Sequence, residues 1–367
     1  MRAEVLSFEM TAPDDMSGLA AALDVGALRA EDVVCVIGKT EGNGLDNDHT
    51  RAFATAALAR LIGGRLGLDE DALFDRISLV LSGGTEGVLN PHMTVFAVRN
   101  DDAAPGAEPA LAIGRAFSRP VAPEQVGRMA QVEATAEAVR AAIAAAGIDD
   151  PADVAYVLAK GVLLMPPDIA EARRRGVALC AGDTHGSKPF TRAATALGVA
   201  LALDEVEARD LNDGMIATAR EVYSAKACVT PGIDRPRSEV VVFGNSRRWS
   251  GDLRVASGAY GDLIDSPAVA GVLDRLGLSP KPQLAPAERA RIAAVIVKGE
   301  PSRSDSIRGR RHTMWRDSDV HALRHFRAAM GGMLAALTGD TRFYIAAGAE
   351  HQGPPGGGTI AVFARRG

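Results

Sequence analysis

The chain has 367 residues, of which 47% are hydrophobic and 24% are charged, values typical of a globular protein with a sizeable core. A net charge of −5 and an aromatic content of 4% argue against a nucleic-acid partner, which would need a basic face with stacking rings. No run reaches the ~18 apolar residues of a membrane helix, and MRAEVLSFEM lacks a long apolar signal segment. The scattered cysteines Cys35, Cys180 and Cys228 form no CxxC pair, so we expect a cytoplasmic enzyme.

Four landmarks recur three times along the chain, always in the same order. A lysine closes an apolar strand, an arginine opens an alanine-rich helix, a turn of small residues follows, and a further strand ends in Val-Phe. Set by set, these landmarks are Lys39, Arg51, Ser82 and Phe96; Lys160, Arg192, Thr230 and Phe243; and Lys298, Arg324, Ala346 and Phe363. The pattern predicts a repeated unit of about 122 residues, a third of the chain, which is large enough to be a small domain.

The repeat predicts three units at 1–104, 105–249 and 250–367. The polar segment NDDAAPGAEP (100–109) suits a linker after the first unit, and SRRWSGD (246–252) precedes the third. Each unit is predicted to contain a strand, a helix, the lysine strand, the arginine helix, the turn strand and the Val-Phe strand. Met129 to Ala145 and Ser266 to Leu276 are examples of the first helix.

This alternation predicts an α/β (α+β) fold in which sheets face inward and helices cover them. Three such sheets around a pseudo-threefold axis would bring the three lysine strands and the three turns together. We therefore expect one central active site, large enough for a compact and roughly threefold-symmetric ligand.

The residue types at this centre suit acyl transfer. Ser82 lies on a Ser-Gly-Gly turn, where the small Gly83 lets backbone N–H groups approach a ligand and stabilise an oxyanion. A lysine whose pKa is lowered by desolvation or nearby cations can serve as the general base for a serine. Arginine recognises planar carbonyl or carboxylate acceptors. Together these groups favour a flat, carbonyl-rich and partly anionic ring as the substrate.

Each landmark alone has a simpler explanation. A lysine at a strand end is usually solvated, and Ser-Gly-Gly is a common tight turn. An arginine in the first turn of a helix is unfavourable, because its positive charge opposes the helix dipole. Repetition in three units favours the functional interpretation. The basic segment SRSDSIRGRRH (302–312) is either a solvated loop or a contact within an assembly. The seven histidines show no HExxH spacing, so no catalytic zinc is indicated.

Four motifs in order resemble the cyanuric acid hydrolase and barbiturase family of ring-opening amidohydrolases. They are GKTEGNG (38–44), LSGGTEGVLNPH (81–92), RGRRHTM (308–314) and GAEHQGPPGGG (348–358). The resemblance spans the chain. It implies three similar units around one active site and assembly as a homotetramer. It also implies hydrolysis of a cyclic amide through one Ser-Lys dyad, with the other two Ser-Lys pairs and the three arginines holding the ring.

The sequence departs from the family at two of the three turns, where the family has serine and generally assigns the nucleophile to the second unit. The second turn has Thr230 and Pro231 and the third has Ala346 and Ala347, so a substrate less symmetric than cyanuric acid fits better. We expect Ser82 with Lys39, or Thr230 with Lys160, to be catalytic. The expected substrate contacts are Arg51, Gly83, Arg192, Pro231, Lys298, Arg324, Ala346 and Ala347.

The resemblance also implies a structural Mg²⁺ or Ca²⁺ ion, with no cofactor for catalysis. Glycine-rich loops expose the carbonyl oxygens that such ions prefer. The implied ligands are Glu300, Ala349, Gln352, Gly353, Pro354 and Gly357. The alternative class of function is a non-hydrolytic relative, a tautomerase or binding protein, in which the cationic pocket holds a planar anion and no acyl-enzyme forms.

Overall fold

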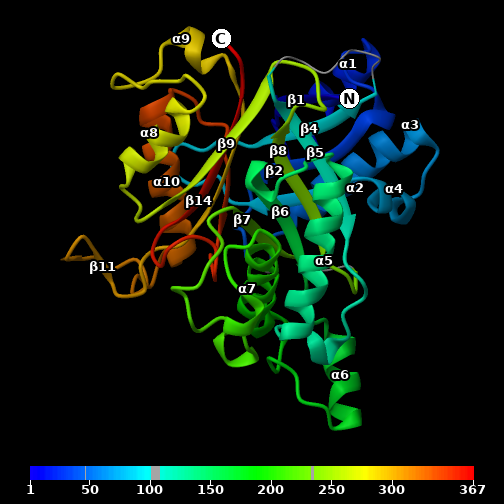
Figure 1. The fold of residues 1–367 in the computed structure, drawn as a ribbon, viewed down its shortest axis with the longest axis vertical. Helices are drawn as coiled ribbons and strands as arrows, with labels where there is room; N and C mark the ends of the chain where they lie inside the picture. The colour runs from blue at the N-terminus through cyan, green and yellow to red at the C-terminus, as the bar shows by residue number, and fades with distance from the viewer. Residues whose placement is uncertain (46, 101–107, 233–234) are drawn as a thin grey trace.

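The computed structural model describes residues 1–45, 47–100, 108–232 and 235–367. Its described part contains three four-stranded sheets with the same internal order, β1-β4-β2-β3, β5-β8-β6-β7 and β9-β14-β10-β13 (Figure 1). In each sheet the lysine strand pairs in parallel with the turn strand and antiparallel with the Val-Phe strand. The α/β architecture of three similar sheets, predicted from the repeat, is confirmed.

The elements follow the predicted order in each third of the chain. The first third contains β1 (Arg2–Glu9), α1 (Ser17–Asp24), β2 (Val33–Thr40), α2 (Thr50–Leu58), α3 (Gly64–Leu66), α4 (Glu70–Arg76), β3 (Ser78–Gly83) and β4 (His92–Arg99). The second contains β5 (Ala110–Phe117), α5 (Met129–Ala145), β6 (Val154–Val162), α6 (Pro166–Arg175), α7 (Thr184–Ala202), β7 (Ala227–Gly232) and β8 (Glu239–Ser246). The last contains β9 (Leu253–Tyr260), α8 (Ser266–Asp274), α9 (Pro286–Arg289), β10 (Ile292–Gly299), β11 (Ser306–Ile307), β12 (Arg310–Arg311), α10 (Ala322–Thr338), β13 (Tyr344–Ala347) and β14 (Gly358–Arg365).

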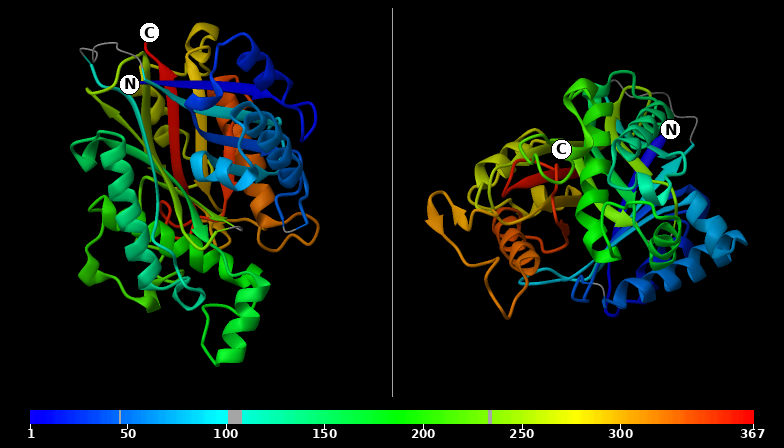
Figure 2. Two further views of the ribbon diagram at one scale, coloured as in Figure 1. Left: turned by 90° about the vertical axis from the view of Figure 1, so that its right-hand side faces the viewer. Right: turned by 90° about the horizontal axis from the view of Figure 1, so that it is seen from below.

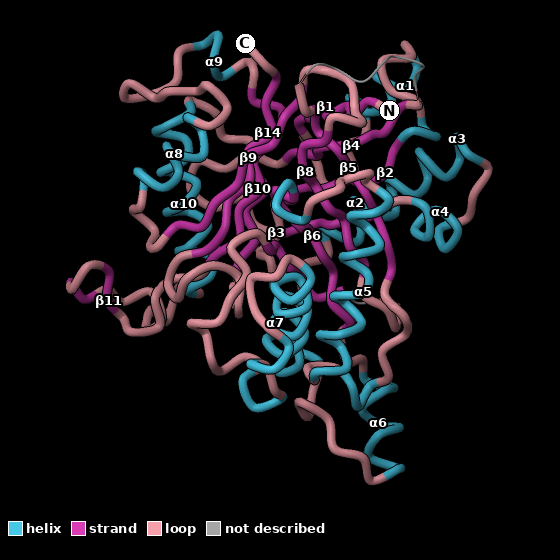
Figure 3. The backbone as a smooth tube through the Cα atoms, viewed as in Figure 1, coloured by secondary structure: helices cyan, strands magenta, loops and turns pink. Residues whose placement is uncertain are grey.

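The strands gather at the centre of the molecule and the helices lie outside them (Figure 3). Phe96, Phe243 and Phe363, the predicted Val-Phe positions, meet in the core with ring centroids 4.9, 5.2 and 5.0 Å apart. All three rings are fully buried, and such tilted and edge-to-face contacts are favourable arrangements for aromatic rings. The three sheets therefore share one core.

Small residues allow helices to approach closely in the second third of the chain. Helix α5 has the bounds predicted from its alanine content, and a Cβ on Gly198 of α7 would lie 2.6 Å from Cβ of Thr135 in α5. Any larger residue at 198 would force the two helices apart. Helix α6 extends away from the rest of the molecule (Figure 2).

Two sequence predictions are corrected in detail. Helix α7 begins at Thr184, so Arg192 lies within the helix instead of opening it. Helix α8 ends at Asp274, before Leu276. The basic segment 302–312 contains the short hairpin β11–β12, whose second strand is exposed, and Arg308 in its turn pairs with Asp262. A contact of this segment within an assembly stays a prediction.

The unit boundaries stay predictions. The boundary at 104/105, like most of the predicted linker 100–109, falls outside the described residues. The boundary at 249/250 falls between β8 and β9.

Candidate active site

Lys39 and Ser82 form a close pair between neighbouring strands. The parallel register of β2 and β3 pairs their Cα atoms, and Nζ of Lys39 lies 3.1 Å from Oγ of Ser82. The same nitrogen lies 2.9 Å from the Ile345 carbonyl oxygen of β13 and 3.2 Å from that of Gly83. Lys39 is fully buried, whereas Ser82 is half-buried. The serine can therefore be reached by a ligand while its neighbour is shielded from water.

The surroundings of Lys39 favour its neutral amine. Burial lowers the pKa of Lys39 well below 10.5, and the nearby Arg327 guanidinium lowers it further. The carboxylates of Glu86 and Asp48 oppose this shift without cancelling it. A neutral Nζ at 3.1 Å can accept the hydroxyl proton of Ser82, which is the geometry required of a general base.

Lys160 and Thr230 have the same backbone register but different side-chain contacts. Their Cα atoms pair between β6 and β7, yet Nζ of Lys160 lies 3.7 Å from the Oε2 atom of Glu239. Within the described ranges, Lys160 makes no hydrogen bond to Thr230. Pro231, which follows the threonine, has no N–H to offer an oxyanion.

Lys298 completes the set of three lysines without a hydroxyl partner. Its Cα pairs with that of Ala346, and its Nζ donates to the Ala347 carbonyl oxygen at 3.1 Å. Burial lowers the pKa of Lys298 to about 8. Because Ala346 has no nucleophilic atom, this lysine can only bind or position a ligand.

Two arginines make paired hydrogen bonds to glutamates on the turns of neighbouring sheets. Arg192 of α7 donates to both carboxylate oxygens of Glu350 at 2.6 and 2.9 Å. Arg327 of α10 donates in the same way to Glu86 at 2.7 and 2.5 Å. Burial raises the pKa of Glu86, but the bonds from Arg327 outweigh it, so the carboxyl group stays ionised. These forks fix the turns that follow Ser82 and Ala346.

Arg327, and not Arg324, occupies the place that corresponds to Arg192. Thr191, the residue before Arg192, packs against Gly161, which follows the lysine of β6. Phe326, the residue before Arg327, packs in the same way against Gly299, which follows the lysine of β10. In the first third, Thr50 bonds Thr40 at 2.8 Å. Arg324 contacts Glu86 through one nitrogen at 3.2 Å, and its side chain is 40% exposed. The matching tetrapeptides HTRA, FTRA and HFRA are the sequence signal for this alignment.

Arg51 makes its hydrogen bond and its ion pair within its own loop. Its guanidinium donates to the Leu45 carbonyl oxygen at 2.6 Å and lies 3.5 Å from Asp48. The turn that would correspond to those of Glu86 and Glu350 includes residues 233–234, outside the described part of the chain.

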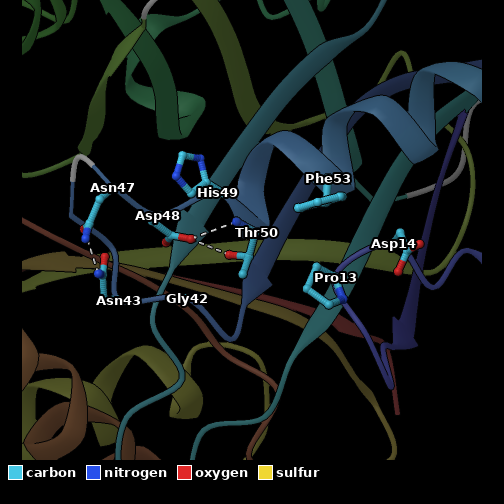
Figure 4. Close-up of a pocket in the computed structure, with 9 residues that line it drawn as sticks. All are labelled: Pro13, Asp14, Gly42, Asn43, Asn47, Asp48, His49, Thr50 and Phe53. Atoms are coloured by element: carbon cyan, nitrogen blue, oxygen red, sulfur yellow. Dashed lines mark hydrogen bonds between the residues drawn. The ribbon is translucent and has the colours of Figure 1, made fainter.

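Asp48 connects this loop to the turn that carries Ser82. It accepts hydrogen bonds from the Thr50 N–H and hydroxyl and from the Gly44 N–H, and it lines an open pocket of about 500 Å³ with Phe53 and Pro13 (Figure 4). A Cβ at residue 83 would lie 1.7 Å from Oδ2 of Asp48. Packing therefore already requires glycine at position 83, independently of any role in oxyanion binding.

The loop expected to hold a cation lies against Glu300. Oε2 of Glu300 accepts from the Ala349 N–H at 3.1 Å, and the Glu300 N–H donates to Gly357 at 3.2 Å. Arg220 and Arg303 also bind this carboxylate. The side-chain oxygen of Gln352 accepts from the Val229 N–H.

This donor set fits a hard cation bound mainly by carbonyl oxygens. Such an ion takes carbonyl oxygens with one or more carboxylates, and each carbonyl keeps a second lone pair when it accepts one hydrogen bond. No group of three or more His, Cys, Asp or Glu suited to a metal occurs among the described residues, so carbonyls would have to supply most of the ligands.

No helix in the described ranges is long and apolar enough to cross a membrane.

Comparison with known proteins places the chain in a family. The family model described as amidohydrolase ring-opening protein matches residues 4–365. The chain belongs to this ring-opening amidohydrolase family. It is 45% identical over 365 residues to the cyclic amide hydrolase of Azorhizobium caulinodans and 42% identical over 370 residues to the cyanuric acid amidohydrolase of a Pseudomonas species, with 100% of each chain covered in both cases.

Solved structures of the family share the whole fold. One cyanuric acid hydrolase, described as an innovation by structural concatenation, matches with a TM-score of 0.93 and 41% identity over 99% of both chains. The enzyme from A. caulinodans matches with a TM-score of 0.89 and 44% identity over 100% of this chain and 99% of its own. The relatives are named as hydrolases, which supports ring hydrolysis over the non-hydrolytic alternative.

Proposed function

We propose that this protein opens a cyclic amide by hydrolysis, with Ser82 as the nucleophile and Lys39 as its general base. The observation that carries the assignment is the 3.1 Å contact between Nζ of Lys39 and Oγ of Ser82, at a lysine whose pKa is lowered by burial. Family membership supports the reaction class. The residues of the first sheet support the assignment of roles.

In the proposed reaction, Oγ of Ser82 attacks a ring carbonyl while its proton passes to Nζ of Lys39. The new C–O bond forms, the ring C–N bond breaks, and Lys39 returns the proton to the departing nitrogen. The product of this step is a ring-opened acyl-enzyme, and water then releases it by hydrolysis. The Gly83 N–H follows the nucleophile directly and is our candidate donor to the oxyanion.

The Thr230 and Lys160 pair lacks two of these features. Lys160 lies next to a carboxylate instead of the hydroxyl, and Pro231 removes the donor that corresponds to Gly83. Loss of one oxyanion donor typically lowers turnover by about 10²–10³. We therefore assign Thr230 and Lys160 to substrate binding.

The proposed substrate is a cyclic imide or ureide with unequal sides. The three turns offer Ser82, Thr230 and Ala346, so only two of them present a hydroxyl group, and Ala346 is buried. A ring with three equivalent carbonyls would therefore meet three different environments. An apolar substituent facing Ala346 and Pro231 would avoid leaving a polar edge unpaired.

A substrate panel tests this function. Cyanuric acid, barbituric acid, hydantoins and cyclic imides are incubated with the wild-type protein, and ring opening is followed by loss of the ring absorbance and by mass spectrometry. We expect at least one ring to open, with hydantoins or cyclic imides preferred over cyanuric acid. If no member of the panel opens at an enzyme concentration that would detect about one turnover per hour, the proposal is wrong.

We also propose a structural Mg²⁺ or Ca²⁺ ion, held by Glu300 and by backbone carbonyls of Ala349, Gln352, Gly353, Pro354 and Gly357. Its role would be to cross-link the loop after β13 to the end of β10, with no part in the chemistry. The homotetramer implied by the family resemblance is likewise a proposal, and light scattering coupled to size-exclusion chromatography measures it.

A further inference from the structure

The main-chain carbonyl of Ile345 reaches the proposed catalytic pair from another sheet. Ile345 lies in β13, which is the edge strand of the third sheet, pairs with β10, and also contacts β2 and β3 of the first sheet. Its carbonyl oxygen lies 2.9 Å from Nζ of Lys39 and 3.3 Å from Oγ of Ser82. The first sheet therefore supplies the hydrogen-bond donors that this buried edge carbonyl requires.

The hydrogen bonds of Lys39 fix the direction of its lone pair. Its Nζ has three oxygen neighbours, the carbonyls of Ile345 and Gly83 and the hydroxyl of Ser82, at 2.9, 3.2 and 3.1 Å. A neutral amine has two N–H donors and one lone pair, and a carbonyl oxygen can only accept. The two carbonyls therefore take both N–H groups. The lone pair is left for the hydroxyl proton of Ser82, as a general base requires.

The same carbonyl serves the serine when Lys39 is protonated. An ammonium ion donates through all three of its hydrogens and has no lone pair. A carbonyl oxygen has two lone pairs, so that of Ile345 can accept from Nζ and from the hydroxyl of Ser82 together. Once Lys39 loses its proton, the hydroxyl has only to rotate toward Nζ.

The buried lysine of the third sheet lacks this contact. Lys298 donates to a carbonyl of its own turn, at Ala347, as the lysine of the first sheet does. Its counterpart to Ile345 would be Val229 of β7, which contacts β10 and stands just before the second turn. Over the described ranges, no hydrogen bond joins Lys298 to Val229, whose N–H donates to the side chain of Gln352. The geometry with two carbonyls thus belongs to the buried lysine that has a serine beside it.

Charged groups near Lys39 act on its pKa but, in the part of the chain that the structure describes, make no hydrogen bond to it. Burial is the largest cause of the lowered pKa, and two guanidinium groups and two carboxylates act from a distance. These groups are Arg327, Arg51, Glu86 and Asp48. Across the ladder, His92 is neutral at pH 7, because burial lowers its pKa to about 4. The direction of the lone pair therefore depends on the carbonyls.

We propose that the Ile345 carbonyl is a positioning group for the reaction: it holds one N–H of Lys39 so that the lone pair of Nζ points at the hydroxyl of Ser82. The third sheet thereby completes the catalytic pair of the first. This inference rests on the proposed function, because it takes Lys39 and Ser82 as base and nucleophile. It gives a role in the chemistry to a turn strand whose following side chains, Ala346 and Ala347, supply no acid, base or nucleophile.

An amide-to-ester change tests this carbonyl without altering any side chain. In Ala346→lactic acid, made by stop-codon suppression in cell-free translation, the linkage after Ile345 becomes an ester, whose carbonyl is a weaker acceptor. The chain offers a matched control, because Ile360 and Ala361 form the same dipeptide in β14 of the same sheet and are equally buried. Ala361→lactic acid introduces the same ester, with the same loss of one N–H, at a carbonyl that is not among the hydrogen-bond partners of Lys39.

The charge state of Lys39 is measured directly. The chain has six lysines, so protein labelled with [ε-¹³C]lysine gives six signals, and that of Lys39 is assigned by its loss in K39M. A carbonyl stabilises an ammonium ion more strongly than an amine, so the ester at 346 should move the Lys39 transition to lower pH by at least about half a pH unit. The ester at 361 should leave the transition in place. An unmoved transition in the 346 ester, with the other five signals those of the folded protein, would overturn the proposal.

Steady-state kinetics separate positioning from a general loss of structure. On the best panel substrate, the ester at 346 should lower kcat at high pH about tenfold, shift the rising limb of kcat/KM to lower pH and leave KM within about threefold. The ester at 361 should move none of these. A shifted Lys39 transition with unchanged kcat would also overturn the proposal, because the contact would exist without positioning the base. If S82A stays active, the proposed function fails, whereas the Lys39 transition still tests the contact.

Discussion

The first and second sheets have the same backbone register at their lysines but a different electrostatic environment. Lys39 faces His92, whose pKa burial lowers to about 4, so no opposite charge lies on the partner strand. Lys160 faces Glu239. One lysine is buried beside a serine and the other is held at a carboxylate. The comparison teaches that lysines with equal backbone register can differ in electrostatic environment through the residue across the ladder and the residues of the neighbouring turn.

The largest expected effect comes from removing the hydroxyl group of the turn in each of these two sheets. S82A should lower kcat by at least about 10³-fold, because removal of a nucleophile leaves only binding and oxyanion stabilisation. T230A, the matched control, should change kcat by less than about tenfold and act mainly on KM. Initial rates on the best panel substrate decide between them. Near-normal turnover of S82A would reverse the two assignments.

The pH dependence of kcat/KM tests the different roles proposed for the two lysines. Lys39 must be neutral to act as a base, so kcat/KM should rise with pH through its lowered pKa and then level off well below pH 10.5. In the pH range between that lowered pKa and 10.5, the unfolded chain binds more protons at this lysine, so its contribution to stability rises with pH. K39M should lose the rising limb and about 10²–10⁴ in kcat while unfolding at the same temperature or higher. A profile that is flat in the wild type from pH 5 to 9 would argue against Lys39 as the base.

A smaller effect distinguishes the two arginines of α10. Arg327 is 4% exposed and holds Glu86 through two nitrogens, whereas Arg324 is 40% exposed and uses one. R327A should lower kcat/KM by about 10²-fold, since it releases the turn behind Ser82 and leaves Glu86 with only the single contact from the more exposed Arg324. R324A should cost less than about fivefold. Equal losses in both variants would place Arg324 in the site as originally predicted from the sequence.

The smallest expected effect concerns the proposed ion. Chelation should lower the unfolding temperature by a few degrees, because the loop after β13 would lose a cross-link, with kcat measured at 25 °C nearly unchanged, because the contact between Lys39 and Ser82 does not involve the ion. Elemental analysis should find about one Mg²⁺ or Ca²⁺ per chain before chelation. Metal-free protein with an unchanged unfolding temperature would leave Arg220 and Arg303 as the partners of Glu300.

The sequence was sufficient to predict features that repeat in all three units. It was not sufficient to predict contacts that depend on which residues lie opposite each other in a sheet. The pairing of each lysine strand with its turn strand follows from the threefold pattern, and the bounds of α5 follow from its alanines, whereas the contact among the three Phe rings was not predicted. Arg324 fits the expected arginine at the start of its helix, whereas the match of HFRA to FTRA indicates Arg327. Glu239 carries no motif. Its contact with Lys160 depends on which residue of β8 lies opposite that lysine, and only the sheet register shows this.

Trapping of the acyl-enzyme tests the central claim most directly, since it identifies the nucleophile itself. The protein is mixed with the best panel substrate, quenched in acid within one turnover, digested and analysed by mass spectrometry. Ring opening loses no atoms, so the modified peptide should gain the full mass of the substrate. We expect this mass on the peptide containing Ser82 and its absence in S82A. The same mass on the peptide containing Thr230 would contradict the account.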